Sequence, residues 1–93
     1  MAIMYKVYIL FSEKTKKYYI GHTENLDNRL LRHNSGLVRS TKSGIPWVII
    51  YTENYRSRQE AYRRELQIKS YKKGEAFKKL IRVDTEAVKR DRL

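Results

Sequence analysis

The chain has 93 residues, a formal net charge of +11 and no cysteine. That length allows one domain with one modest core, and 41% hydrophobic residues is typical of a folded protein rather than a disordered one. The composition excludes a disulfide framework, a thiolate metal site and a membrane span, because no apolar run approaches the roughly 18 residues that a span needs. Charges also interrupt the N-terminal stretch, so there is no signal-peptide core and we expect a cytoplasmic protein.

The net charge is the strongest compositional feature. A short chain this basic favours a polyanionic partner, with nucleic acid ahead of an anionic membrane surface, and we expect no membrane partner. Charge alone does not say whether the bound polymer is cut.

Two short apolar and aromatic runs open the chain. Residues 5–11 predict a strand, and a central one because both of its faces are apolar; residues 18–21 predict a second strand after a polar hairpin loop. Residues opposite each other in a hairpin share a face, so a loop of even length places Tyr8 and Tyr19 on the same face. Gly21 allows another group to approach the backbone closely.

A first helix follows the hairpin. Thr23 or Asn25 can cap it, and residues 34–36 provide a stop. Arg29 and His33 are four positions apart, so they lie on one helical face beside a leucine stripe.

The middle of the chain reads as a loop and a third strand. Residues 37–46 form the loop, in which Arg39 and Lys42 stand among hydroxyl residues that suit phosphate contact, although each could be an ordinary solvated residue. Residues 47–52 predict the strand.

A second helix begins near residue 57, with Ser57 as the cap and Glu60 as its capping-box partner. The helical pattern breaks at 72–74, and residues 77–81 predict a short third helix. We therefore expect an α/β fold of the α+β kind, with a three-stranded antiparallel or mixed sheet flanked by about three helices in the order β-β-α-β-α-α. We assign the domain to residues 1–83 and a charged, flexible tail to 84–93.

Glu65 does not fit a plain amphipathic helix. On a helical wheel it falls, with Lys69, inside an apolar arc formed by Ala61, Tyr62, Leu66 and Ile68. A carboxylate half-buried against a sheet is costly unless it is paired or binds a metal. A local Glu65–Lys69 pair would explain it, and helix geometry favours neither that pair nor a functional role over the other.

Taken together, these residues resemble the GIY-YIG nuclease family. Residues 6–8 stand for its first motif and Tyr19–Gly21 for its second, and Arg29, His33 and Glu65 follow in the family's order. The resemblance covers about residues 5–81 and is closest to small stand-alone members similar to the N-terminal domain of excinuclease C. Lys6 replaces the glycine of the first motif, His22 follows the second motif where other residue types are common, and no separate DNA-binding domain is attached.

The resemblance implies a metal-dependent endonuclease. One divalent ion, Mg²⁺ or Mn²⁺, would be held chiefly by Glu65, which suits a hard cation that keeps much of its water. Arg29 would bind the scissile phosphate, and Tyr8 would act as general base or position the attacking water if positive charge from Lys6, Arg29 or the metal lowers its pKa. Tyr19 would hydrogen-bond the phosphate or the water, and His33 would accept the proton of Tyr8 or orient it; the two tyrosines could exchange roles. We expect the nucleic acid to be contacted by a wider basic set: Lys6, His22, Arg39, Lys42, Lys69, Lys72 and Lys73.

The preferred hypothesis is therefore hydrolysis of DNA phosphodiester bonds, on structured or damaged DNA in repair or recombination. The alternative is a nucleic-acid-binding module that keeps the fold but cuts weakly or not at all. A third is an RNA-directed basic protein, although no RNA-binding motif is present in the sequence. A homodimer on DNA, or a partner protein that targets the substrate, is compatible with a single active site.

Overall fold

The computed structural model describes residues 3–81 and confirms the expected α+β fold. Three antiparallel strands form one sheet in the order β2-β1-β3, so the first strand is central as predicted. The tail predicted at 84–93 lies outside the described residues. The elements are β1 (Tyr5–Ser12), β2 (Lys17–Thr23), α1 (Leu26–Asn34), the 3-10 helix η1 (Arg39–Gly44), β3 (Trp47–Tyr55), α2 (Arg58–Ser70) and helical residues 75–81.

The helices begin where their caps predict. The Asn25 side chain accepts the backbone N–H of Asn28 at 3.0 Å, and Ser57 accepts that of Glu60 at 3.1 Å. The predicted loop, by contrast, contains η1, and β3 runs three residues further than the apolar run that predicted it. β3 extends because the backbone of Tyr55 still has a partner, Tyr5 at the start of β1.

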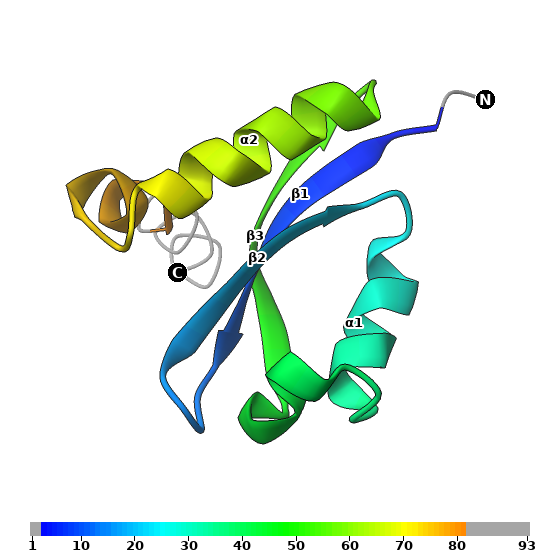
Figure 1. Ribbon diagram of the computed structural model, residues 1–93, viewed down its shortest axis with the longest axis vertical. Coiled ribbons are helices and arrows are strands. Elements are labelled where there is room, and N and C mark those ends of the chain that lie inside the picture. Colours follow the sequence, from blue (N-terminus) through cyan, green and yellow to red (C-terminus); the bar gives the residue numbers. More distant parts are fainter. Residues whose placement is uncertain (1–2, 82–93) are drawn as a thin grey trace, which may run out of the picture.

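The sheet carries a core on each face (Figure 1). α2 covers one face, where Val7 and Ile9 pack against Ala61, Ile68 and Phe77. α1 and η1 lie on the other side, over a core of Tyr8, Leu10 and Trp47. Because β2 lies at the edge of the sheet, side chains on the two faces can approach each other past this strand.

The hairpin register places the motif tyrosines together. Tyr8 pairs with Gly21, and Leu10 pairs with Tyr19. Tyr8 and Leu10 are two residues apart and share a face, so Tyr19 lies on that face too, as the even loop predicted. This is the face that α1 covers.

The predicted apolar arc of α2 is wrong in part. Ala61, Glu65 and Ile68 are buried against the sheet, whereas Tyr62 and Leu66 are 50% and 47% exposed. Ala61, Glu65 and Ile68 are spaced by four and then three residues, so they lie on one helical face. Tyr62 and Leu66 each follow a buried residue by one position and therefore lie at the side of that face. Glu65 therefore holds a central position of the buried face.

Glu53 fastens α2 to β3. Arg64 donates to both carboxylate oxygens of Glu53, at 2.8 and 2.9 Å, and Tyr55 donates to one of them at 2.6 Å. Tyr51 donates to the other oxygen. No helix within residues 3–81 is long and apolar enough to cross a membrane.

Candidate active site

Three predicted site residues meet on the α1 face of the sheet. The hydroxyl of Tyr8 lies 3.4 Å from Nε2 of His33, and both side chains are 1% exposed. The ring of Tyr19 stacks on Tyr8 with centroids 6.3 Å apart, and it lies 4.6 Å from the His33 ring. β1, β2 and α1 each supply one member of this cluster.

Gly21 makes room for Tyr8. A Cβ atom on this glycine would lie 2.6 Å from the Tyr8 hydroxyl oxygen and 2.8 Å from its ring carbon. Real Cβ contacts are essentially never this short, so the Tyr8 side chain occupies the space that any larger residue at position 21 would take. The close approach expected at this glycine is made by Tyr8.

The Thr41 hydroxyl links His33 to η1. It lies 2.9 Å from Nδ1 of His33 and donates to the Val38 carbonyl at 3.3 Å. In the Nδ1–H tautomer of His33, the hydroxyl accepts from Nδ1 and Nε2 accepts from Tyr8; in the other tautomer, Nε2–H donates to Tyr8. Burial and the charges of Arg29 and Arg32 lower the pKa of His33, so the ring is neutral near pH 7.

Sequence reasoning missed Thr41. It is 2% exposed and lies within η1, in the stretch that was expected to be a solvated loop. The sequence signal was one hydroxyl among several in a basic loop, and nothing in that pattern distinguishes the buried one.

The protein alone does not lower the pKa of Tyr8. Burial raises it well above its ordinary value, the charges of Tyr19 and Glu65 act in the same direction, and Arg29 opposes them without overcoming them. Lys6 donates to Asn54 at 2.7 Å, on the β3 side of the strand. Arg29 thus acts on the pKa of Tyr8 in the expected direction, but burial outweighs it.

Glu65 lies on the other face of the sheet and has two partners. Its Oε1 is 2.5 Å from Nδ1 of His22, and its Oε2 is 2.5 Å from Nζ of Lys69. The expected local Glu65–Lys69 pair is thus present, and His22, expected to contact nucleic acid, contacts the carboxylate. The negative charge of Glu65 also raises the pKa of Tyr8, so side chains on the two faces of the sheet interact electrostatically.

The carboxylate of Glu65 fits a hard divalent cation with few protein ligands. The Glu65 residue is 8% exposed and an ammonium group already lies against Oε2, so positive charge is accommodated there. Among residues 3–81, no group of three or more His, Cys, Asp and Glu side chains could hold a metal. If Glu65 holds a cation, water and substrate oxygens would complete the shell.

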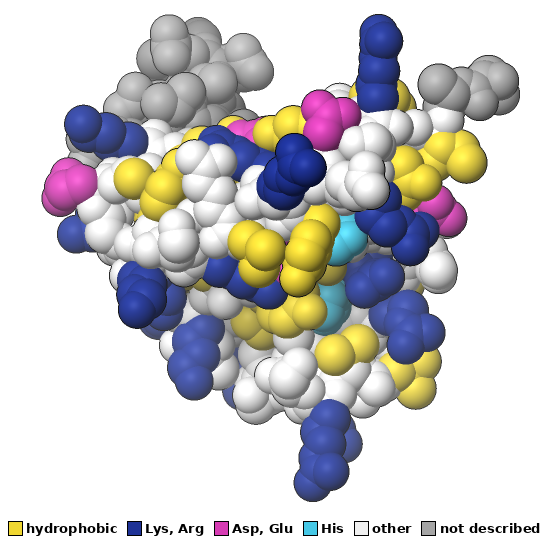
Figure 2. All heavy atoms as spheres, turned by 45° about the horizontal axis from the view of Figure 1, so that its top comes forward, with side chains coloured by type: hydrophobic (Ala, Val, Ile, Leu, Met, Phe, Trp, Pro, Cys, Tyr) yellow, Lys and Arg dark blue, Asp and Glu magenta, His cyan; other side chains and the backbone are white. Residues whose placement is uncertain are grey.

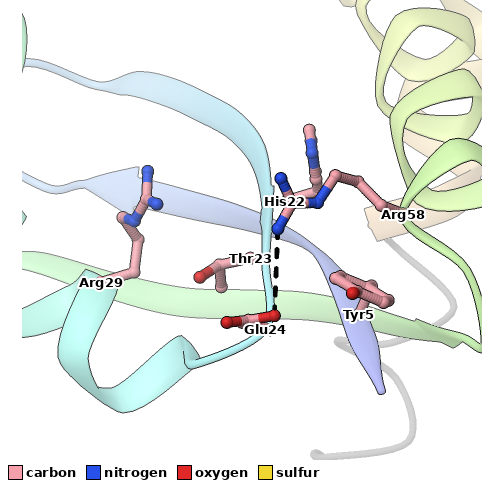
Figure 3. A pocket seen from close by; sticks show the side chains of 6 residues that line it. All are labelled: Tyr5, His22, Thr23, Glu24, Arg29 and Arg58. Atoms are coloured by element: carbon pink, nitrogen blue, oxygen red, sulfur yellow. Dashed lines mark ion pairs between the residues drawn. The ribbon is translucent and has the colours of Figure 1, made fainter. Parts of the chain in front are cut away.

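Arg29 borders a pocket at the corner between β2 and α1 (Figure 3). The pocket has a volume of about 200 Å³, and Arg58 approaches it from the start of α2, where it forms a 3.9 Å ion pair with Glu24. Tyr5, His22, Thr23 and the carboxylate residue Glu24 complete the lining. Two guanidinium groups around one hollow suit the oxygens of a phosphate, and Arg58 was not among the residues expected to bind nucleic acid.

The remaining expected contacts lie at two places. Arg39 and Lys42 are exposed on η1, which packs on α1, while Lys72 and Lys73 follow the end of α2. Nζ of Lys73 lies 5.9 Å from the centre of the Tyr18 ring, on the α2 face. Figure 2 shows Lys and Arg side chains spread across one face of the molecule, around an exposed hydrophobic patch.

The chain is similar to a family of catalytic domains and to several small proteins. Residues 4–79 match the GIY-YIG catalytic domain family. A UPF0213 protein of Staphylococcus haemolyticus is 36% identical over 66 residues, which are 70% of this chain and 80% of the relative. A UPF0213 protein of Halobacterium salinarum is 34% identical over 74 residues, or 77% and 94% of the two chains. The solution NMR structure of a UPF0213 protein from Bacillus halodurans has a TM-score of 0.45 at 31% identity, covering 72% of this chain and 71% of that one.

Proposed function

Since the chain belongs to the GIY-YIG family of nucleases, we propose that it is a metal-dependent endonuclease that hydrolyses DNA phosphodiester bonds. The observation that carries the proposal is the hydrogen-bonded series Tyr8–His33–Thr41, with the charges of Arg29 and Glu65 acting on Tyr8. We assign structured or damaged DNA as the substrate and Mg²⁺ or Mn²⁺ as the cation.

Tyr8 and His33 would move the proton of the attacking water. The neutral phenol donates its proton toward Nε2 of His33, so a lone pair of the same oxygen is left to accept a proton from water. As the hydroxide forms the new P–O bond, the water proton passes to Tyr8 and the phenol proton to His33; the bond to the leaving oxygen breaks, and that oxygen takes a proton from solvent. This step uses the Nδ1–H tautomer of His33, in which Thr41 accepts from Nδ1 and Nε2 accepts from Tyr8.

Arg29 and Tyr19 would hold the phosphate. The guanidinium of Arg29 borders both the pocket and Tyr8, so it can bind a phosphate oxygen and stabilise the charge that builds in the transition state. Tyr19 packs against both Tyr8 and His33 and would direct its hydroxyl toward phosphate or water. A divalent cation held at Glu65 would neutralise further phosphate charge and favour ionisation of groups near it.

The test is nicking of supercoiled plasmid and cleavage of branched DNA, with Mg²⁺, with Mn²⁺ and with chelator. Tyr8→Phe, Arg29→Ala and Glu65→Gln should each lower the rate by about 10²-fold or more while DNA binding persists. Tyr18→Phe is the matched control, because it makes the same chemical change next to Tyr19 but on the α2 face, and its rate should equal that of the unmodified protein.

Two results would contradict the proposal. Cleavage that survives chelator would contradict the metal dependence. Cleavage that survives Tyr8→Phe and Glu65→Gln would mean that the assigned residues do not form the active site. Salt-sensitive DNA binding without cleavage of any substrate would favour the alternative, a nucleic-acid-binding module of the same fold.

A further inference from the structure

The ammonium group of Lys69 lies 2.5 Å from one oxygen of Glu65, Oε2. We propose that Lys69 is a built-in competitor of the metal, so that its ammonium group must leave Oε2 before a divalent cation can bind there. The inference rests on the proposed function, because it takes Glu65 as the metal ligand.

The two oxygens of Glu65 differ in how firmly they are held. A carboxylate only accepts hydrogen bonds, so Nδ1 of His22 carries a proton and donates it to Oε1 at 2.5 Å. The His22 side chain is 23% exposed, and its ring packs edge-on against Tyr62 with centroids 5.8 Å apart. Oε1 is thus fixed by a packed ring on the neighbouring strand, which orients the carboxylate.

Oε2 is held by a group that can leave. Lys69 lies one turn along the same helix, its side chain is 50% exposed, and its ammonium reaches Oε2 at 2.5 Å on a flexible four-carbon stem. A rotation of that stem moves the charge into solvent without disturbing the helix. The cost of release is the loss of an ion pair with a carboxylate that is only 10% exposed.

A divalent cation and the ammonium group exclude each other at this oxygen. A divalent cation bound at Oε2 would lie next to Nζ of Lys69, and two positive charges so close together would repel each other strongly. An i,i+4 Glu–Lys pair on an exposed helix face would be an ordinary surface contact. Here it is the burial of Glu65 beneath β2 that turns the pair into competition for one coordination position.

The experiment measures Mn²⁺ binding without DNA, by water-proton relaxation. Lys69→Met removes the competitor and should bind Mn²⁺ about two- to tenfold more tightly than the unmodified protein. Lys69→Arg keeps a cation at the position and should show no gain. Lys78→Met, in helical residues 75–81, removes the same charge away from Glu65 and controls for a general change in electrostatic potential. Circular dichroism melts show that each variant is folded.

Each outcome decides the matter. Equal Mn²⁺ affinity in the Lys69→Met variant and the unmodified protein would overturn the competition, provided that Glu65→Gln loses Mn²⁺ binding. An affinity gain in Lys78→Met equal to that in Lys69→Met would overturn it as well, because net charge would then explain both. Binding that survives Glu65→Gln would instead remove Glu65 as the metal ligand, and the proposed metal site would fail along with the inference.

Discussion

Tyr8 has its position because the residue opposite it in β2 has no side chain. The Tyr8 hydroxyl oxygen lies 2.6 Å from where a Cβ at position 21 would be, and the same hydroxyl lies 3.4 Å from Nε2 of His33. Because the Tyr8 ring is buried, it cannot rotate away from an added methyl group without disturbing its neighbours. The glycine of the second motif thus has a packing role that is directly tied to the chemistry.

Gly21→Ala should therefore separate catalysis from folding. We expect the added methyl group to displace the Tyr8 hydroxyl and lower the cleavage rate by about 10²-fold, since misplacement by about 1 Å has effects of that size. Overpacking should lower the free energy of unfolding by about 1–3 kcal/mol. Cleavage kinetics and urea unfolding measure the two effects, and a full cleavage rate in the folded variant would show that the close contact is unimportant.

At this scale the sequence predicted which residues form the cluster but not how they are held. The pairing of Tyr8 with Tyr19 followed from strand periodicity, and their proximity to His33 was implied by the family's motif order. The contacts of His33 with Thr41 and of His22 with Glu65 join residues 8 and 43 positions apart. Such contacts depend on the packing of η1 and α2, and no local pattern encodes them.

Glu53 of β3 accepts four hydrogen bonds, two from Arg64 of α2 and two from Tyr51 and Tyr55 of its own strand. Burial raises the pKa of Glu53, but the bonds from Arg64, Tyr51 and Tyr55 outweigh it and lower the pKa to about 2 from 4.5. The pKa of Tyr55, whose hydroxyl donates to the same carboxylate, is raised to about 12 by its burial and by Glu53. Since α2 carries Glu65, this clamp also positions the proposed metal ligand.

Glu53→Gln should destabilise the fold and change its acid sensitivity. We expect the free energy of unfolding at pH 7 to fall by about 1–3 kcal/mol, because hydrogen bonds to a charged group are lost. A carboxyl whose folded pKa is depressed contributes stability above its unfolded pKa of 4.5, and that contribution is lost as pH falls toward about 2. The gap between the two proteins should thus narrow below pH 4.5.

Urea unfolding at several pH values tests this, with Glu13→Gln as the control. Within the described part of the chain, Glu13 forms an ion pair with Lys16 across the exposed hairpin loop, so its loss should change stability by less than about 0.5 kcal/mol. A gap between Glu53→Gln and the unmodified protein that stays constant from pH 7 to pH 3 would contradict the role given to the Glu53 carboxylate.

Element boundaries were predictable where one residue controls them. Asn25 and Ser57 cap their helices because their side chains satisfy backbone N–H groups that the first turn leaves open. The end of β3 and the η1 helix were not predictable, because they depend on partners elsewhere. Residues 53–55 continue the strand because they pair with residues 5–7 of β1. The η1 helix is held by the Trp47 indole, which donates to the Thr41 carbonyl at 2.7 Å.

For the whole molecule, the net charge of +11 raises the question of whether DNA binding is diffuse or localised. Arg39 and Lys42 stand on η1, next to the helix that carries His33, so they are the cations expected to guide a strand into the site. Each phosphate contact adds about 0.9 to the magnitude of the slope of log affinity against log salt concentration for duplex DNA. Replacing both with glutamine should therefore lower that magnitude by about 1.8.

The comparison that decides this is a second double variant, Lys78→Gln with Lys79→Gln, in the helical residues beyond α2. Both double variants lower the net charge from +11 to +9, so a diffuse attraction would weaken equally in the two proteins. Localised contact predicts a reduced salt slope for the η1 variant and a nearly unchanged slope for the other. Equal slopes in the two variants would mean that the overall charge, and not the surface beside His33, brings DNA to the protein. Arg58 and Arg29 at the pocket would then be left as the contacts that place a phosphate near Tyr8.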